Sequence, residues 1–163
     1  MKAIFLDIDG VLNCDATPNP RNFPYVVDPL LLDRFQELVR VTSATVVLSS
    51  SWRVDPIGRL AAQFYGIPFD DICPDMPDAP RCDELQSWLN AHPDVTRYVV
   101  IDDEDDCLDE LPLFQPSAKT GLTSEIALGV EAFLAGESDT DMRQGALVRF
   151  GQNIHAWLKR DKD

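Results

Sequence analysis

A short apolar run, Ala3 to Leu6, leads directly into an acidic pair, Asp7 and Asp9, and then into Gly10. An unbroken apolar run of this kind is typical of a parallel strand that is buried on both faces. Because Asp7 and Asp9 are two residues apart, their side chains point the same way on an extended backbone. Ligands of open α/β sheets bind beyond the carboxyl ends of the strands. The two carboxylates therefore indicate a candidate active site rather than part of a core.

The rest of the chain alternates between apolar runs and segments in which apolar residues recur at helical spacing. We expect strands at 45–48, within 67–72, at 98–101 and at 113–114, and helices over 29–41, 56–65, 81–91 and 124–135. Asp28-Pro29 and Asp55-Pro56 each combine an N-cap residue with proline at the first helical position. Residues 13–27 hold three prolines and predict a long loop. The alternation predicts an α/β fold with a parallel sheet between helical layers.

Two further expectations concern the packing of helices. The second helix is expected to bury an apolar stripe formed by Ile57, Leu60, Ala61 and Phe64. We expect one domain over residues 1–136, followed by an extension over 137–163. The extension carries apolar residues at helical spacing, which predicts an amphipathic helix packed on the domain; these are Leu147, Phe150, Ile154 and Leu158.

Acidic residues outnumber basic ones, 28 to 14, which gives a formal net charge of −14. This charge disfavours unspecific binding to nucleic acid or to an anionic membrane surface. No apolar run approaches the ~18 residues that a transmembrane helix needs. We therefore expect no membrane contact and no extended nucleic-acid interface. The four cysteines form no CxxC pair, which disfavours a zinc site, and no signal-peptide pattern precedes the first strand. These features favour a cytoplasmic protein with reduced thiols.

Polar residues follow three of the predicted strands. Asp7 and Asp9 follow the first, Ser49 follows the second, and Asp102 and Asp103 follow the strand at 98–101. Parallel strands bring their carboxyl ends to one edge of the sheet, so these residues are expected to converge. Oxygen ligands of this kind suit Mg²⁺. The protein ligands would be Asp7, the main-chain carbonyl of Asp9, and Asp102 or Asp103.

The sequences that surround these residues resemble the haloacid dehalogenase (HAD) superfamily. The motifs are FLDIDGVLN at 5–13, LSSSWR at 48–53, VVIDD at 99–103 and TGLT at 120–123. Within the superfamily they look like the HAD domain of Swiss Army Knife RNA-repair proteins, over Lys2 to about Gly136. The resemblance implies a Rossmann-like, HAD-type parallel sheet in three layers, with Mg²⁺ as cofactor. The segments between the motif-bearing strands are too short for an inserted cap domain, so we expect an open site.

The same resemblance implies a phosphatase that works by double displacement. Asp7 would attack phosphorus and become an aspartyl phosphate. Asp9 would protonate the leaving oxygen and then activate water. Ser49 or Ser50 would hydrogen-bond a phosphoryl oxygen. Relatives that dehalogenate lack the second aspartate, so Asp9 favours a phosphatase.

The family also uses a basic residue upstream of the second acidic pair. Arg81 is the best positional match, and Lys119 is the alternative. We also expect four residues to contact the substrate: Gly10, Ser50, Arg53 and Lys119. Trp52 could stack on a base, although a buried core tryptophan is the alternative interpretation.

An open site favours a phosphomonoester substrate, either a small one or a nucleotide or nucleic-acid terminal phosphate. Two other functions share these residue types. One is a Mg²⁺-binding phosphoacceptor domain with a regulatory role. The other is a degenerate binding module without catalysis.

Overall fold

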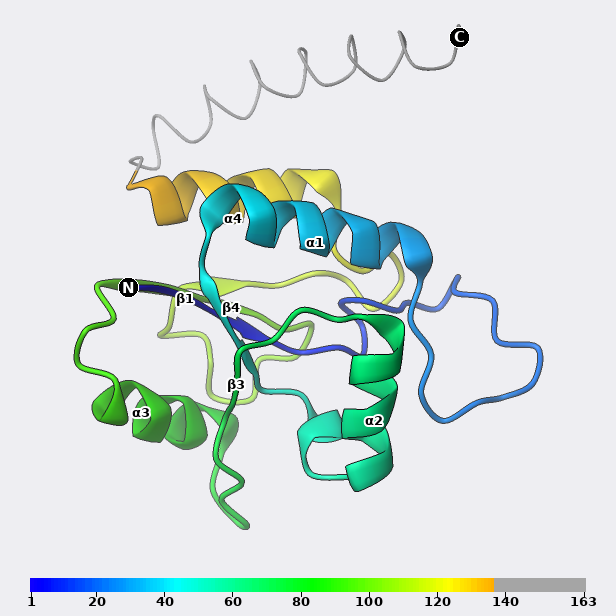
Figure 1. Ribbon diagram of the computed structural model, residues 1–163, viewed down its shortest axis with the longest axis horizontal. Helices are drawn as coiled ribbons and strands as arrows, with labels where there is room; N and C mark the ends of the chain where they lie inside the picture. Colours follow the sequence, from blue (N-terminus) through cyan, green and yellow to red (C-terminus); the bar gives the residue numbers. More distant parts are fainter. Residues whose placement is uncertain (137–163) are drawn as a thin grey trace, which may run out of the picture.

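The central feature of the fold is one parallel sheet (Figure 1). The computed structural model describes residues 1–136. In this part of the chain the sheet has five strands: β1 (Lys2–Leu6), β2 (Thr45–Leu48), β3 (Asp71–Ile72), β4 (Arg97–Ile101) and β5 (Leu113–Phe114). Their order is β3-β2-β1-β4-β5, and every pairing is parallel. From β1 the chain therefore passes to β2 and then to β3 on one side of the sheet. It then returns to β4, on the other side of β1, and continues outward to β5. Ligand sites of open α/β sheets lie where the order reverses, here beside β1.

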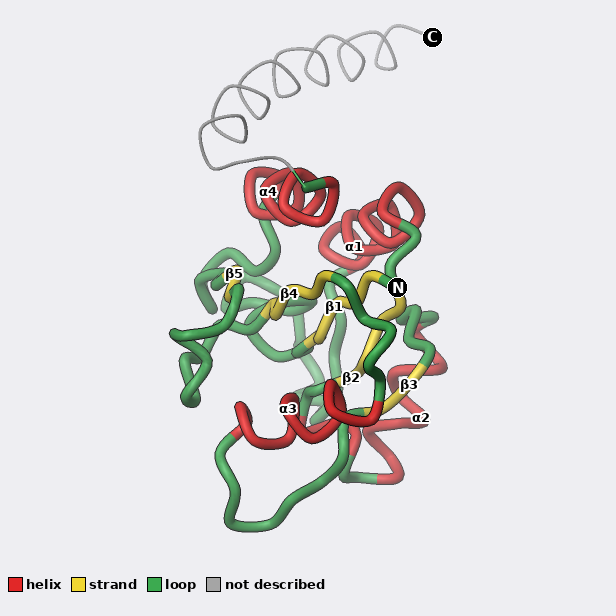
Figure 2. The backbone as a smooth tube through the Cα atoms, turned by 90° about the vertical axis from the view of Figure 1, so that its left-hand side faces the viewer, coloured by secondary structure: helices red, strands yellow, loops and turns green. Residues whose placement is uncertain are grey.

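Helices cover both faces of the sheet (Figure 2). They are α1 (Pro29–Thr42), α2 (Pro56–Tyr65), α3 (Arg81–Ala91) and α4 (Ser124–Ala135), with a short 3-10 helix, η1 (Ser51–Arg53), after β2. Alternate strand residues such as Ile4, Leu6 and Val46 pack with α1 and α4. The residues between them, such as Phe5 and Val47, pack with α3. The predicted three-layer α/β fold is therefore confirmed.

The helix boundaries follow the capping signals of the sequence. The Asp28 side chain accepts hydrogen bonds from the amides of Leu30 and Leu31, and α1 begins at Pro29. Asp55 caps α2 in the same way. These two caps and the predicted loop before α1 are confirmed. No helix or strand lies between β1 and α1 in the described residues, so no cap domain is inserted there.

The orientation of α2 differs from the expectation. Gly58 and Ala62 are its buried residues, whereas Ile57, Leu60 and Phe64 are exposed, Phe64 by 86%. The predicted buried stripe is therefore wrong for these three residues. The reason is the close approach of α2 to η1: a Cβ atom on Gly58 would lie 2.6 Å from the main-chain oxygen of Trp52. Only small residues fit on that side, so the large apolar ones face outward.

The expectation of reduced thiols is wrong for two of the cysteines. Cys82 and Cys107 form a disulfide, while Cys14 and Cys73 are free. Spacing in the sequence could not predict the pair, because it depends on α3 lying beside the loop that follows β4.

The predicted helix of the C-terminal extension, with Leu147 and Phe150, lies outside the described residues. Among the helices that are described, none is long and apolar enough to cross a membrane.

Gly58→Ala tests the orientation of α2. Alanine favours a helix by about 1 kcal/mol over glycine, yet here the added methyl group would clash with the main chain of Trp52. We expect a net destabilisation of about 1–3 kcal/mol in urea unfolding. The matched control is Leu60→Ala on the exposed side of α2, which should change the free energy of unfolding by no more than about 0.5 kcal/mol. The reverse ranking would contradict the observed orientation.

Candidate active site

The ends of the three central strands form the floor of the site. Main-chain hydrogen bonds continue just past the strands: the Asp7 amide donates to Ile101 O (3.0 Å), and the Ser49 amide donates to Leu6 O (2.9 Å). Asp102 directly follows the last residue of β4 in the chain. The sheet ladder therefore fixes the main chain from which the acidic and hydroxyl side chains project.

Three carboxylates converge at this edge. Asp7, Asp102 and Asp103 each offer an oxygen atom, and these atoms all lie within 4.8 Å of one another. Asp7 is only 7% exposed and Asp102 only 4%. The group offers hard oxygen donors of the kind that Mg²⁺ prefers, and it could hold a metal ion. The strand order expected from the sequence brings these three residues to one edge of the sheet, and the structure places them together there.

Burial raises the pKa values of these carboxyl groups. For Asp7, loss of solvation is the main cause, the charge of Asp102 adds to it, and Arg81 opposes it, so that the pKa is raised to about 8. For Asp102, loss of solvation raises the pKa to about 6. The pKa of Asp103 is raised for the same reason. Three acids that resist ionisation at close range gain most from a cation, so the donor set fits a divalent metal.

Asp9 is placed differently. Its side chain is exposed, and its two carboxylate oxygens accept hydrogen bonds from Asn13 and Trp52, each 2.8 Å long. It is not a member of the three-carboxylate group. The metal contact predicted for Asp9 concerns its main-chain carbonyl and stays a prediction.

Arg81 is the basic residue beside Asp7. Its Nη1 lies 3.8 Å from Asp7 Oδ1 and donates to the main-chain oxygen of Ser49. The carboxylate of Glu84, one turn along α3, lies 3.8 Å from Arg81 Nε. Lys119 is exposed, and its side chain makes no hydrogen bond or ion pair among the described residues. Arg81, rather than Lys119, therefore adjoins the predicted nucleophile.

The two candidate serines have different surroundings. The Ser50 hydroxyl acts on Asp7 so as to lower its pKa, and Ser50 Oγ accepts a bond from the amide of Trp52 (3.4 Å). The Ser49 hydroxyl is fully buried and, alone among such side-chain atoms in residues 1–136, has no hydrogen-bond partner. A buried hydroxyl without a partner calls for an explanation, and a ligand oxygen at this edge would supply one.

Gly10 is constrained by close packing. It has a φ of +71°, and a Cβ atom there would lie 2.2 Å from the Asp103 carboxyl carbon. Its amide donates to Asn13 Oδ1 (3.0 Å). Gly10 therefore allows Asp103 to approach the first strand, while its own amide is already bonded within the protein.

Arg53 does not face the site, contrary to the predicted substrate contact. It is buried, and its Nη2 lies 2.5 Å from Glu84. Its remaining donors bond main-chain oxygens of Ser49, Ser50, Cys73 and Pro74. The guanidinium thus stabilises the main chain at the end of β2 through these hydrogen bonds. Nothing in the spacing of the sequence reveals this, because Glu84 lies on a different helix.

Trp52 is 2% exposed, which agrees with the interpretation as a buried residue, yet its indole N–H reaches Asp9. This contact was missed at the sequence level, as were the roles of Asn13 and Glu84. The Asn13 contact could have been inferred from the sequence, since Asn13 follows Asp9 by four residues in a loop. No nearby sequence pattern indicates the contacts of Trp52 and Glu84.

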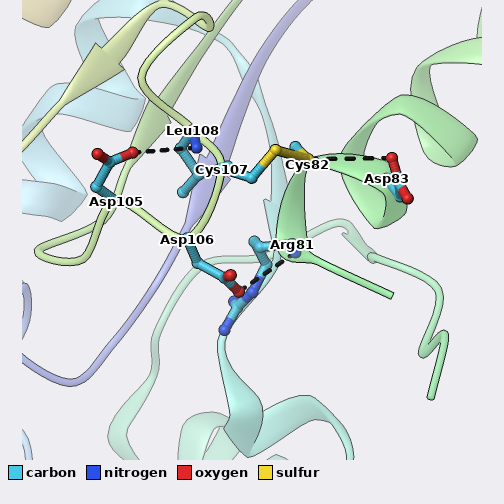
Figure 3. The surroundings of a disulfide bond; sticks show 7 residues. All are labelled: Arg81, Cys82, Asp83, Asp105, Asp106, Cys107 and Leu108. Atoms are coloured by element: carbon cyan, nitrogen blue, oxygen red, sulfur yellow. Dashed lines mark hydrogen bonds between the residues drawn. A yellow bond between two sulfur atoms is a disulfide. The ribbon is translucent and has the colours of Figure 1, made fainter. Parts of the chain in front are cut away.

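The disulfide lies next to the site (Figure 3). Cys82 follows Arg81 at the start of α3, and Cys107 lies in the loop that begins with Asp102 and Asp103. The Arg81 amide also donates to Asp106 Oδ2 (3.3 Å) in that loop. Two contacts therefore connect the start of α3 to the acidic loop.

Comparison with known proteins gives one family. Residues 3–127 match the family described as the HAD domain in Swiss Army Knife RNA repair proteins. The match includes all three strand ends and α3. No individually curated protein matches the chain significantly.

Asp7→Asn tests the electrostatic cost of the site. The ordinary pKa of the carboxyl group is 3.8, and the folded-state value is about 8. The folded state therefore binds more protons, so wild-type stability without metal falls as pH rises from about 4 to about 8. The asparagine variant escapes this cost. In EDTA it should be more stable than wild type at about pH 8, and by a smaller margin at about pH 5.

Urea unfolding at both pH values measures the margin. The control is Asp109→Asn, which replaces an exposed carboxylate in the loop after β4. It should change stability little at either pH. An equal margin for Asp7→Asn at both pH values would contradict the raised pKa.

Proposed function

Because this chain belongs to the family of HAD domains found in Swiss Army Knife RNA repair proteins, we propose that it is a Mg²⁺-dependent phosphomonoester hydrolase. The observation that carries the proposal is the position of Asp7. It directly follows the central strand, it is nearly buried, and it lies close to Arg81 and to the carboxylates of Asp102 and Asp103. This arrangement suits a carboxylate that attacks a phosphoryl group, whose charge must be neutralised by its surroundings.

Asp7, Asp102 and Asp103 would hold the cation, with the Asp9 carbonyl as a further ligand. When bound, Mg²⁺ would neutralise negative charge on the carboxylates and on the transferring phosphoryl group. The hard oxygen donors and the raised pKa values of Asp7 and Asp102 support this assignment.

In the proposed reaction an Asp7 oxygen attacks phosphorus, and the bond from phosphorus to the leaving oxygen breaks. The product is an aspartyl phosphate on Asp7. Arg81 stabilises the phosphoryl oxygens and the ionised form of Asp7. The unpartnered hydroxyl of Ser49 donates to a phosphoryl oxygen, whereas the Ser50 hydroxyl favours the ionised form of Asp7.

Asp9 acts as the general acid and then as the general base. It gives a proton to the leaving oxygen in the first step. In the second step it takes a proton from the water that attacks the aspartyl phosphate, which frees Asp7 and releases phosphate. The exposed position of Asp9, beside the nucleophile on the same strand end, supports both roles.

The substrate we propose is a phosphomonoester on a nucleotide or on a nucleic-acid end. The absence of a cap between β1 and α1 in the described residues leaves room for a group larger than a sugar. The description of the family names RNA repair, which agrees with a nucleic-acid substrate. The net charge of −14 disfavours a long nucleic-acid footprint, so recognition is confined to the terminal phosphate and its neighbours.

The test is a substrate panel with Mg²⁺ or with EDTA. The panel contains p-nitrophenyl phosphate, nucleoside monophosphates, sugar phosphates, and oligonucleotides phosphorylated at the 3′ or 5′ end. We expect Mg²⁺-dependent release of phosphate from at least one nucleotide or oligonucleotide. Asp7→Asn should reduce this activity at least about 10³-fold, whereas Asp109→Asn should retain it.

Two outcomes would overturn the proposal. A phosphorylated Asp7 that persists for minutes would indicate a phosphoacceptor domain. Binding of phosphorylated ligands that neither requires Mg²⁺ nor changes in Asp7→Asn would indicate a non-catalytic binding module.

A further inference from the structure

Both oxygens of the Asp9 carboxylate are held by side chains from different parts of the chain. Asn13 Nδ2 donates to Oδ1, and Trp52 Nε1 donates to Oδ2, each at 2.8 Å. Asp9 is otherwise exposed and follows the end of β1. An exposed aspartate that lacked these donors would rotate among several conformations. The two bonds select one orientation.

The tryptophan is a rigid donor. It lies in η1, directly after β2, and is 2% exposed. Its ring meets that of Tyr25 edge to face, with 4.8 Å between centroids. The Tyr25 hydroxyl in turn bonds Asp55, the cap of α2. The indole N–H is therefore fixed by packing and can impose its direction on Asp9.

Asn13 is equally well anchored. Its Oδ1 accepts from the Gly10 amide (3.0 Å), and its Nδ2 also donates to Val26 O (2.9 Å). One side chain thus connects the turn after β1, the Asp9 carboxylate and the end of the long loop.

We propose that Trp52 and Asn13 are positioning residues that aim the Asp9 carboxylate for proton transfer. The inference rests on the proposed function, in which Asp9 is the acid and base. Each carboxylate oxygen has two lone pairs, so each can accept a bond from its holder and still carry the transferred proton. A carboxylate fixed in this way is ready for both proton transfers without reorganisation.

The chain offers a matched control in Trp88. It is also buried, at 4% exposure, and its indole N–H also donates to an aspartate, Asp71 Oδ2, at 2.7 Å. Trp88 lies on α3 in the core on the other face of the sheet. Trp52→Phe and Trp88→Phe therefore remove the same kind of bond, and only the first touches Asp9.

The experiment measures kcat/KM for phenyl phosphate and for p-nitrophenyl phosphate. A poor leaving group depends on protonation by Asp9, whereas a good one needs it less. Trp52→Phe should lower kcat/KM for phenyl phosphate at least about tenfold, out of the ~10²–10⁴-fold that general acid catalysis contributes. The loss for p-nitrophenyl phosphate should be several-fold smaller. Asn13→Ala should shift the ratio in the same direction, and Trp88→Phe should leave it unchanged.

Equal losses for both substrates in Trp52→Phe and in Asn13→Ala would overturn the inference, as would a shifted ratio in Trp88→Phe. Unfolding curves of all variants separate these results from a loss of folded protein. A wild-type protein that hydrolyses no phosphomonoester would overturn the proposed function itself, and this inference with it.

A second inference rests on the disulfide. Cys82 is half-buried and Cys107 is exposed, so a dithiol can reach the bond. Cys107 has a φ of +63°, a conformation that L residues rarely adopt. Between Asp103 and Leu111 only Leu108 is buried, in one cluster with Leu85 and Trp88 of α3. The Arg81–Asp106 hydrogen bond and the disulfide also join this loop to α3 (Figure 3). The covalent bond is thus one of the restraints on this loop.

We propose that the Cys82–Cys107 pair makes the activity of the same site depend on redox state. A dithiol reduces the bond by thiol–disulfide exchange: two electrons and two protons pass to the cysteines, and the reductant becomes a disulfide. Reduction frees Cys107 to leave its left-handed conformation. The loop that begins with Asp102 and Asp103 can then move relative to Arg81, which stays bonded to Ser49 O, so the oxidised protein is the more active form. This inference also rests on the proposed function.

The test compares kcat in oxidising buffer and in dithiothreitol, with thiol counting. We expect the count to rise from two, Cys14 and Cys73, to four. Activity should fall at least about tenfold, since a 1 Å misplacement can cost about 100-fold. The variant Cys82→Ser/Cys107→Ser should have the lower activity in both buffers, and Cys14→Ser should respond as wild type does.

Unchanged activity at four free thiols would overturn the redox inference. A double variant that still responds to dithiothreitol would also overturn it. Loss of the near-UV circular dichroism spectrum on reduction would overturn it as well, because the bond would then hold the whole fold together. Inactivity of the oxidised wild type toward every phosphomonoester would instead overturn the proposed function.

Discussion

The arrangement of the site depends on one unfavourable interaction, the crowding of desolvated carboxylates at the end of β1. Asp7 is nearly buried, and its pKa is raised to about 8 by loss of solvation and by the nearby charge of Asp102. Arg81 offsets part of this cost at 3.8 Å. Placing three acids this close costs stability, which is typical of functional sites and supports the proposed binding of a cation and a phosphoryl group.

The main chain fixes the positions of most residues of the site. Main-chain hydrogen bonds past the strand ends fix Asp7 and Ser49. Because Gly10 has no side chain, the carboxyl group of Asp103 can lie against it. Buried Arg53 then ties the end of β2 to Glu84, which also lies beside Arg81. The charged residues of the site are therefore connected through groups that do not themselves face a substrate. Rigid elements of this kind are what keep a catalytic group in its productive geometry.

The strands and the caps could be predicted because each depends on a short stretch of sequence. The convergence of Asp7 with Asp102 and Asp103 could be predicted because parallel strands end at the same edge of the sheet. The sequence did not predict contacts that depend on how elements pack. The outward turn of Phe64 follows from the close approach of α2 to η1. The Cys82–Cys107 bond and the Trp52–Asp9 bond each join segments far apart in the chain. Arg53 was misassigned for the same reason, since its partner Glu84 lies 31 residues away.

The most direct test of this account is a crystal structure of the protein grown with Mg²⁺. We expect one ion about 2.1 Å from oxygens of Asp7 and of Asp102 or Asp103, the distance that Mg²⁺ requires. We also expect the ion to be lost in Asp7→Asn. An ion bound elsewhere, or no ion between these carboxylates at millimolar Mg²⁺, would show that the buried acids do not share a cation.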